Sequence, residues 1–390
     1  MRVEVVIVHH RGGPRLLRTL ASLHTQTLPP SHIRVIDDGS GDGSMAAVAR
    51  AYPHVEVTVL SPGAGKPSVG RNLGLAEADA PLVMLLDHDV ALEADALARL
   101  AAVFAADESV AAAGPLLCYD REPDAAGAED VIYLGLSTLH HLGVSSGGQR
   151  DLPAADHAPA RPVRSLPGGN MMWRRDVAQA LGGFDTGYAF GWGEDGELAV
   201  RAQLAGWRTL LVPAARGFHE HRPRGRARGE AQYYNRLRLL ATTVNARTAL
   251  LLLPAWLAFE AALFVCGLRT GCARLQARAW RRLLRDQHDI TTRRRAVQAT
   301  RRVGDAALLD AESLMQDAKR GGPGLLARVE PLITRALALH WRAASRLMRR
   351  VDMQPPRAEP LHLPDGPIGT RSADDAGQPN TASTEASVAA

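Results

Sequence analysis

The sequence contains few cysteines, and none of them are closely spaced. Among its 390 residues there are three, Cys118, Cys266 and Cys272. They lack the spacing of a zinc motif, and any disulfide pairing would leave one of them unpaired. We therefore expect no structural disulfide, and a reducing compartment such as the cytosol fits best.

A long apolar run is missing at the N-terminus. Arg2 and Glu4 flank and interrupt the first valines, so the run Val5-Val6-Ile7-Val8 is too short for the core of a signal peptide. We interpret it as a first β-strand and expect the main domain to lie on the cytoplasmic side. No internal repeat is evident.

Positive charge is unevenly distributed along the chain. The formal net charge is +5, yet residues 216–302 contain 19 Arg against 5 Asp or Glu, a local excess of 19 − 5 = +14. Such a region could bind nucleic acid or an anionic membrane surface. The neighbouring apolar sequence favours the membrane, and we expect no nucleic-acid partner.

The apolar sequence runs from Thr248 to Leu268 and is interrupted by Glu260 and Pro254. Its length is close to the roughly 20 residues that span a bilayer. Arginines flank it on both sides, however, so the charge asymmetry typical of a spanning helix is missing. We expect a monotopic, interfacial or re-entrant segment at the cytoplasmic face of the membrane, and a buried core helix is the alternative.

Apolar segments alternate with segments of helical composition in the first part of the chain, which predicts βαβ units and a parallel sheet. Met171 to Leu181 is predicted to be helical, with Gly182-Gly183 ending it. Three regions are expected: an α/β domain over 1–220, a helical, basic and apolar region over 221–350, and a disordered tail over 351–390. The predicted strands are Val3–Val8, Ile33–Ile36, Val55–Leu60 and Leu82–Leu86, and the predicted helices are Pro14–Leu23, Ser44–Ala51 and Ser68–Ala78.

Pairs of acids follow two of the predicted strands. Asp87-His88-Asp89 comes directly after Leu82 to Leu86, an unbroken apolar run that suits a strand buried on both faces. Asp37-Asp38 closes an earlier strand. Open α/β sheets bind ligands at this edge. Because two neighbouring anions need a compensating charge, a divalent cation that holds a diphosphate is the natural ligand.

A second acidic pair lies much further along the chain, in Gly191-Trp192-Gly193-Glu194-Asp195. Leu198, Ala202 and Ala205 share one helical face and Gly206 can end that helix, so Glu194 and Asp195 should lie at its N-terminus. Asp195 could cap this helix. Further on, His219 and His221 follow an apolar run that ends at Val212.

The order and spacing of Asp37-Asp38, Arg71-Asn72 and Asp87-His88-Asp89 resemble those of family 2 glycosyltransferases, which have the GT-A fold, a Rossmann-like nucleotide-diphospho-sugar transferase fold. The resemblance covers residues 1 to about 220. The Gly-Trp-Gly-Glu-Asp block is similar to that of galactosyltransferase-like enzymes.

The resemblance implies a metal-dependent, inverting transfer of a hexose or deoxyhexose from a nucleotide-diphosphate sugar to a hydroxyl. Asp195 would take the proton of that hydroxyl, a role that can coexist with capping the helix, and Glu194 would be the second acid of the catalytic pair. The nucleotide would be held by Asp37, Asp38, Arg71, Asn72 and Asp87. The Mn²⁺ or Mg²⁺ ion would be held by Asp87, Asp89 and His219, with His221 as the second candidate for the histidine ligand. The acceptor would be bound by Trp192 and Gly193.

The helical part is similar to bacterial enzymes that glycosylate lipid-linked glycans in cell-surface polysaccharide biosynthesis. The Gln-x-x-Arg-Trp block of processive synthases is missing, which favours single addition. Two alternatives stay open. One is a non-catalytic, membrane-associated protein that binds a nucleotide or a glycan. The other is a nucleotidyltransferase, because Arg11-Gly12-Gly13 is weakly similar to the glycine-rich loop that follows the first strand in those enzymes.

Overall fold

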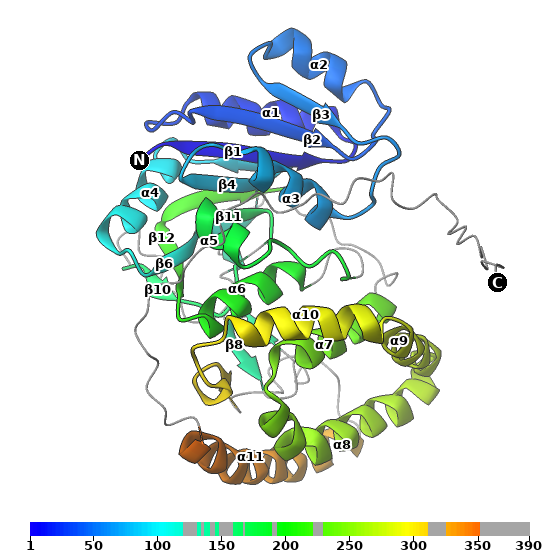
Figure 1. The fold of residues 1–390 in the computed structure, drawn as a ribbon. Coiled ribbons are helices and arrows are strands. Elements are labelled where there is room, and N and C mark those ends of the chain that lie inside the picture. Colours follow the sequence, from blue (N-terminus) through cyan, green and yellow to red (C-terminus); the bar gives the residue numbers. More distant parts are fainter. Residues whose placement is uncertain are drawn as a thin grey trace, which may run out of the picture.

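The structure is a computed structural model, and it describes residues 1–119, 131–133, 136–140, 145–147, 159–166, 168–188, 193–220, 229–310 and 325–351. An α/β part with a large sheet is followed by a group of helices that lies beside one end of it (Figure 1). The predicted tail from residue 352 onward lies outside the described residues, and the three predicted region boundaries stay predictions.

One half of the large sheet, from β4 to β3, is parallel. Its strand order is β10-β12-β6-β11-β4-β1-β2-β3, with β5 and β7 paired at the side. β1 (Val3–His9) lies between β2 (His32–Asp37) and β4 (Leu82–Asp87), and β3 (Glu56–Val59) pairs with β2. Apolar side chains in β4 are buried on both faces, as its unbroken apolar run predicts. The predicted βαβ order is confirmed.

The sheet continues past β4 with strands of both directions. β11 (Asn170–Arg174) is antiparallel to both β4 and β6 (Val110–Tyr119). β12 (Arg208–His219) is parallel to β6 and also pairs with β5 (Val90–Leu92). The short strands are β7 (Val131–Tyr133), β8 (Leu136–His140), β9 (Ser145–Gly147), β10 (Arg161–Pro162) and β13 (Leu309–Asp310), of which β8, β9 and β13 form a separate small sheet.

The prediction of a helix from Met171 to Leu181 is wrong in its first half. The residues 170–174 form β11, and the helix α5 is only Arg175–Ala180. Met171, Met172 and Trp173 are fully buried, because this strand lies inside the sheet and both of its faces are covered. A continuous apolar run of this kind does not distinguish a buried strand from a helix. The expected end of the helix at Gly182-Gly183 is confirmed, since α5 ends just before these two glycines and both have positive φ.

Helices cover both faces of the sheet. α1 (Gly13–His24), α2 (Ser44–Ala51) and α4 (Ala96–Ala106) pack on one face, and α3 (Pro67–Glu77), α5 and α6 (Glu194–Leu204) pack on the other. In α6, Leu198, Ala202 and Ala205 are buried as predicted. The two cores hold the strand ends rigidly, which is what a site at the sheet edge requires.

The helices after the sheet are α7 (Gly229–Thr243), α8 (Ala246–Thr270), α9 (Ala273–Arg285), α10 (Gln287–Ala299) and α11 (Leu325–Val351), with the 3₁₀ turn η1 (Asp305–Ala307). The predicted helical character is confirmed. α8 is long and apolar enough to cross a membrane. It is not a buried core helix, because Leu250, Leu257, Val265 and Leu268 are each more than half exposed.

Candidate active site

Three neighbouring strands end beside one cleft. In the sheet register Val8 lies opposite Asp87, and His9 lies opposite Asp37, so the carboxyl ends of β1, β2 and β4 form one edge. The cleft at this edge has a volume of about 650 Å³. Its lining includes Asp38, Asp87, Asp89, Arg71, Glu194 and Asp195. Residues as far apart in sequence as Asp38 and Asp195 thus share one cavity, as the acidic motifs predict.

The two acids of the first pair have different environments. Asp38 lines the cleft, and its carboxylate accepts a hydrogen bond from the backbone N–H of Ala64. Gly63 lies so close that a Cβ atom there would be 2.3 Å from the Asp38 carbonyl oxygen. Asp37 instead is buried and accepts hydrogen bonds from the backbone N–H and hydroxyl of Ser40. Asp37 therefore shapes the loop, whereas Asp38 faces the ligand space.

Arg71 connects the acidic motifs. This fully buried side chain of α3 donates to Asp87 Oδ1 at 3.2 Å and to Glu194 Oε1 at 3.1 Å. Burial by itself would lower the pKa of the guanidinium, but the charges of Asp87, Glu194 and Asp195 outweigh it and raise the pKa. The sequence predicts that Arg71 holds the nucleotide. In the structure its contacts are with the acids that line the cleft.

Asn72 is a scaffold residue in this structure. Its side-chain amide donates to the carbonyl of Phe184 at 2.9 Å and accepts from the N–H of Phe184 at 2.7 Å. Both backbone groups of Phe184 are thereby held. Asn72 does not line the cleft, so its predicted contact with the nucleotide has no geometric support here.

Two glycines make room for the acids, and the sequence analysis did not single them out as site residues. A Cβ atom at Gly169 would lie 1.7 Å from Cγ of Asp87, and one at Gly168 would lie 3.0 Å from Oδ2 of Asp195. Only glycine fits where backbone and carboxylate approach so closely. The adjacent pair Gly168-Gly169 at the start of a strand is the signal that could have identified them.

Asp89 and His219 come together from strands that are far apart in sequence. Nε2 of His219 lies 3.4 Å from Oδ1 of Asp89, and both side chains are largely buried. The backbone N–H of Glu220 also donates to the carbonyl of Asp89 at 3.1 Å. An oxygen and a nitrogen donor at this separation fit two ligands of one Mn²⁺ or Mg²⁺ ion.

No cluster of three or more such ligands exists among the residues that the structure describes. Asp87 is bonded to Arg71, so of the three predicted metal ligands the described residues bring together Asp89 and His219. The alternative candidate His221 lies outside the described residues.

Glu194 and Asp195 are the first residues of α6, as predicted. The N-cap is Gly193, with φ of 90°, and no side chain caps the helix, so the interpretation of Asp195 as the N-cap is wrong. Oδ1 of Asp195 accepts from the N–H of Gly196 at 2.8 Å. Oε2 of Glu194 is buried and has no hydrogen-bond partner in the described parts of the chain. The predicted acceptor residue Trp192 lies outside the described residues. Gly193 has a left-handed backbone conformation that glycine adopts easily, and the right-handed helix α6 begins directly after it.

The pKa of Asp195 is raised to about 6. The main cause is burial beside the cleft, and the neighbouring negative charge of Glu194 adds to it, whereas Arg71 opposes it. A carboxyl group with such a pKa is still ionised at neutral pH and is a better proton acceptor than an ordinary aspartate. Asp195 therefore has the properties of a general base.

His9 is a cleft residue to which the sequence analysis assigned no role. Its ring is fully buried, packs edge-on against His88 with ring centroids 4.8 Å apart, and lines the cleft with His10. Burial, with the nearby His88, lowers the pKa of His9 to about 4, so the ring is neutral. The position of His9 at the end of the first strand could have identified it as a cleft residue.

Comparison with known proteins agrees with this geometry. Residues 2–244 match the family model described as glycosyltransferase like family 2. An N-acetylglucosaminyl-diphospho-decaprenol L-rhamnosyltransferase of Mycobacterium tuberculosis (strain ATCC 25618 / H37Rv) is 30% identical over 253 residues, 59% of this chain and 80% of that protein. The probable glycosyltransferase YdaM of Bacillus subtilis (strain 168) is 25% identical over 222 residues, 55% of this chain and 49% of that protein.

Two solved structures share the fold. GalNAc-T7 with UDP, GalNAc and Mn²⁺ has a TM-score of 0.51 at 21% identity, over 63% of this chain and 48% of that one. S. aureus TarS with UDP-GlcNAc has a TM-score of 0.51 at 15% identity, over 90% of this chain and 93% of that one.

The fold and the acid-lined cleft thus define a glycosyltransferase of the GT-A class, followed by a helical region with one long apolar helix. The chain belongs to glycosyltransferase family 2. The predicted family, fold class and enzyme class are confirmed, and the non-catalytic and nucleotidyltransferase alternatives find no support. The similarity of the Gly-Trp-Gly-Glu-Asp block to galactosyltransferase-like enzymes stays a prediction.

Proposed function

We propose that this enzyme moves a sugar, with inversion, from a nucleotide-diphosphate donor to a hydroxyl of a lipid-linked glycan in cell-surface polysaccharide biosynthesis. The M. tuberculosis relative is named for a rhamnosyl transfer to a diphospho-decaprenol acceptor, which favours a deoxyhexose donor and a polyprenyl-linked acceptor here. The observation that carries the proposal is that Asp195 and the pair Asp89 and His219 belong to the same edge of the molecule, with Asp195 and Asp89 in one cleft.

The chemistry follows from the positions of these groups. Asp195 takes the proton of the acceptor hydroxyl while the hydroxyl oxygen forms a bond to the anomeric carbon of the donor. The bond from that carbon to the diphosphate oxygen breaks on the opposite face. Arg71 donates hydrogen bonds to both Glu194 and Asp87 and so holds these two carboxylates beside the base. Asp38 binds the nucleoside. Asp89 and His219 would hold a divalent cation, which neutralises the negative charge of the departing diphosphate.

The first test is a screen of nucleotide sugars for protection against thermal unfolding, with and without Mn²⁺ or Mg²⁺. A matched donor at 100 times its Kd is expected to stabilise the fold by about 2.7 kcal/mol through mass action. EDTA should abolish the effect, and Asp89→Ala should do the same. Protection that is equal in EDTA would contradict the metal assignment, and failure of every nucleotide sugar would contradict the donor class.

The rate of transfer should depend on pH through Asp195. Because its pKa is raised to about 6 and the reactive form is ionised, activity should be constant above neutral pH and fall as the pH drops below about 6. At pH 5 about one tenth of the plateau rate is expected. Donor binding measured at each pH separates this effect on the rate from any effect of pH on occupancy of the cleft. A rate that stays flat down to pH 4.5 would rule out Asp195 as the base.

We further propose that α8 lies on the anionic cytoplasmic face of the membrane, as a monotopic or peripheral contact. Its exposed apolar side chains include Leu250, Leu253, Leu257, Val265 and Leu268. Arg247 and Arg269 are exposed near its two ends, and α11 adds exposed Arg342 and Arg346 nearby. In Figure 1, α8 and α11 lie at the side of the molecule farthest from β3.

The membrane contact predicts that the double change Leu257→Glu and Val265→Glu weakens binding to phosphatidylglycerol vesicles. Each buried methylene group contributes about 0.8 kcal/mol, so the loss should exceed about tenfold. Val59→Glu is the matched control, because Val59 is 52% exposed on β3 at the opposite side of the molecule. Equal binding of neutral and anionic vesicles, or of the double variant and the parent, would contradict this proposal, and resistance to alkaline extraction would indicate a spanning helix.

A further inference from the structure

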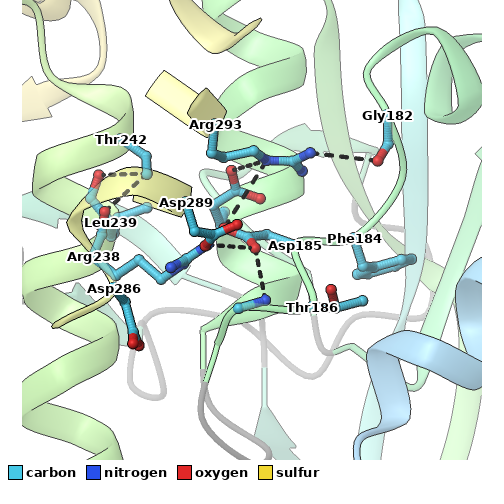
Figure 2. A network of polar contacts seen from close by, with 12 residues as sticks. Gly182, Phe184, Asp185, Thr186, Arg238, Leu239, Thr242, Asp286, Asp289 and Arg293 are labelled. Atoms are coloured by element: carbon cyan, nitrogen blue, oxygen red, sulfur yellow. Dashed lines mark hydrogen bonds and ion pairs between the residues drawn. The ribbon is translucent and has the colours of Figure 1, made fainter. Parts of the chain in front are cut away.

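A buried ion pair joins α7 of the helical region to the segment 182–188, which follows α5 in the chain. Arg238 of α7 forms two hydrogen bonds with Asp185, from Nε to Oδ2 at 2.9 Å and from Nη2 to Oδ1 at 2.8 Å. Both side chains are almost fully buried, with 1% of Arg238 and 6% of Asp185 exposed. Figure 2 shows the pair at the meeting point of α7, α10 and the segment that contains Asp185. A two-bond contact of this kind fixes orientation as well as distance.

Additional partners hold Arg238 from the helical side. Its guanidinium donates to Asp289 of α10 at 2.6 Å and to the hydroxyl of Tyr234 at 3.1 Å. The Tyr234 hydroxyl in turn donates to Asp286 at 2.9 Å. These contacts use the donors of a buried cation that would otherwise be costly to desolvate. The helices α7 and α10 thus present a fixed guanidinium to Asp185.

The segment 182–188 is held from three directions. Arg293 of α10 donates to the carbonyl of Gly183 at 3.0 Å, and Asn72 of α3 holds both backbone groups of Phe184. Gly187 lies against Arg238, since a Cβ atom there would be 2.1 Å from Nη2. The backbone of this segment therefore cannot move without disturbing the guanidinium of Arg238.

The same contacts lead to the start of the catalytic helix. The ring of Tyr188 lies under Arg238, with Cζ 5.8 Å from the ring centroid. Its Cε1 is 3.4 Å from the position of a Cβ atom on Gly193, and Cβ of Asn235 in α7 is 3.9 Å from that position. Gly193 directly precedes Glu194 and Asp195. A continuous packing path thus connects Arg238 with the residue that sets the first turn of α6.

We propose that Arg238 is a positioning residue, which holds the segment 182–188 through Asp185 and so aims Glu194 and Asp195 into the cleft. The helical region would then orient the catalytic pair of α6 in addition to its proposed contact with the membrane. The inference rests on the proposed function only in treating Asp195 as the base. The positioning itself is a statement about geometry, and it can be measured without any turnover.

The test compares Arg238→Gln with Asp289→Asn by hydrogen–deuterium exchange in the full chain. Arg238→Gln removes the paired bonds to Asp185. Asp289→Asn keeps an oxygen that can accept the hydrogen bond from Arg238, removes only the charge of a side chain that is 64% exposed, and leaves the Asp185 contact in place. The informative amides are those of Gly187, which donates to Asp185 Oδ1 at 2.8 Å, and Glu197, which donates to the Gly193 carbonyl at 2.9 Å. Arg238→Gln is expected to speed their exchange about tenfold or more while amides of β4 are unchanged.

Binding and turnover give the second readout. Calorimetry with UDP or dTDP and Mn²⁺ should show nucleotide affinity within about threefold of the parent, because the Asp38 side of the cleft is untouched. With a donor found in the thermal screen, kcat should fall more than about tenfold at a nearly constant donor KM, and Arg238→Lys should recover part of the loss.

Three outcomes would overturn the proposal: unchanged exchange at Glu197 in Arg238→Gln, exchange that rises equally in β4, and a kcat that falls as much in Asp289→Asn. The second would mean that Arg238 serves stability alone. A full rate in Asp195→Asn would remove the proposed base but leave the exchange result intact, so the two failures can be told apart.

Discussion

Asparagine in place of Asp195 is expected to lower the rate of sugar transfer by about 100-fold to 10,000-fold, the usual contribution of a general base. The amide has nearly the same shape, so it can still accept the hydrogen bond from the N–H of Gly196, but it cannot take a proton. Burial and Glu194 raise the pKa of Asp195, so its ionised form accepts a proton more readily than an ordinary aspartate does. The measurement is kcat with a saturating donor and Mn²⁺.

The matched control is Asp42→Asn. Asp42 is an exposed carboxylate near α2 whose pKa is lowered to about 2 by hydrogen bonds from Ser44, and it does not line the cleft. Its loss should leave kcat within about threefold. Donor affinity of Asp195→Asn should match the parent. If this variant keeps the parental rate with intact donor binding, Asp195 is not the base and the proposed mechanism fails.

Methionine in place of Arg71 is expected to destabilise the fold by about 3–5 kcal/mol, because removing one partner of a buried ion pair leaves its acids uncompensated. Arg71 donates to both Asp87 and Glu194, and Asp195 lies beside them. Arg71 opposes the rise in the pKa of Asp195, so in the variant the folded-state pKa of Asp195 should rise further above its unfolded value. Stability is then retained at low pH, where Asp195 is protonated in both states, and is lost as the pH rises.

The free energy of unfolding of Arg71→Met, measured with urea at pH 5 and pH 8, should therefore differ more from the parent at pH 8. Arg208→Met is the control. Arg208 forms an ion pair with Asp107 in which the side chains are 47% and 30% exposed, and its loss should cost about 1 kcal/mol or less at either pH. A destabilisation of Arg71→Met that is the same at both pH values would show that its packing, and not its charge, supports the site.

Local patterns predicted the central strands and their acids well. The apolar run of β4 and the acids after it follow each other in the chain, and the ends of parallel strands must meet at one edge, so Asp38, Asp87 and Asp89 could be placed from sequence. The start of α6 was likewise predicted, because its helical face and the glycine that ends it belong to the same short stretch of chain as Glu194 and Asp195.

Features that depend on contacts between distant segments were missed. β11 has the same local pattern as a buried helix, and only its place between β4 and β6 makes it a strand. Arg71 was predicted to bind the nucleotide, but its hydrogen bonds with Asp87 and Glu194, which belong to other elements, were not predicted. The bond between Arg238 and Asp185 spans 53 positions, and no spacing rule relates residues that far apart.

The antiparallel pairing of β11 with β4 constrains how enzymes of this type can diverge. The N–H of Asp87 donates to the carbonyl of Gly169 at 2.6 Å, and Asn170 lies opposite Leu86. A single-residue insertion or deletion in β11 would shift this register and bring a side chain where only a hydrogen atom fits against Asp87. Lineages that acquire new acceptors should therefore vary the chain before Gly168 in length, while the five residues of β11 keep theirs.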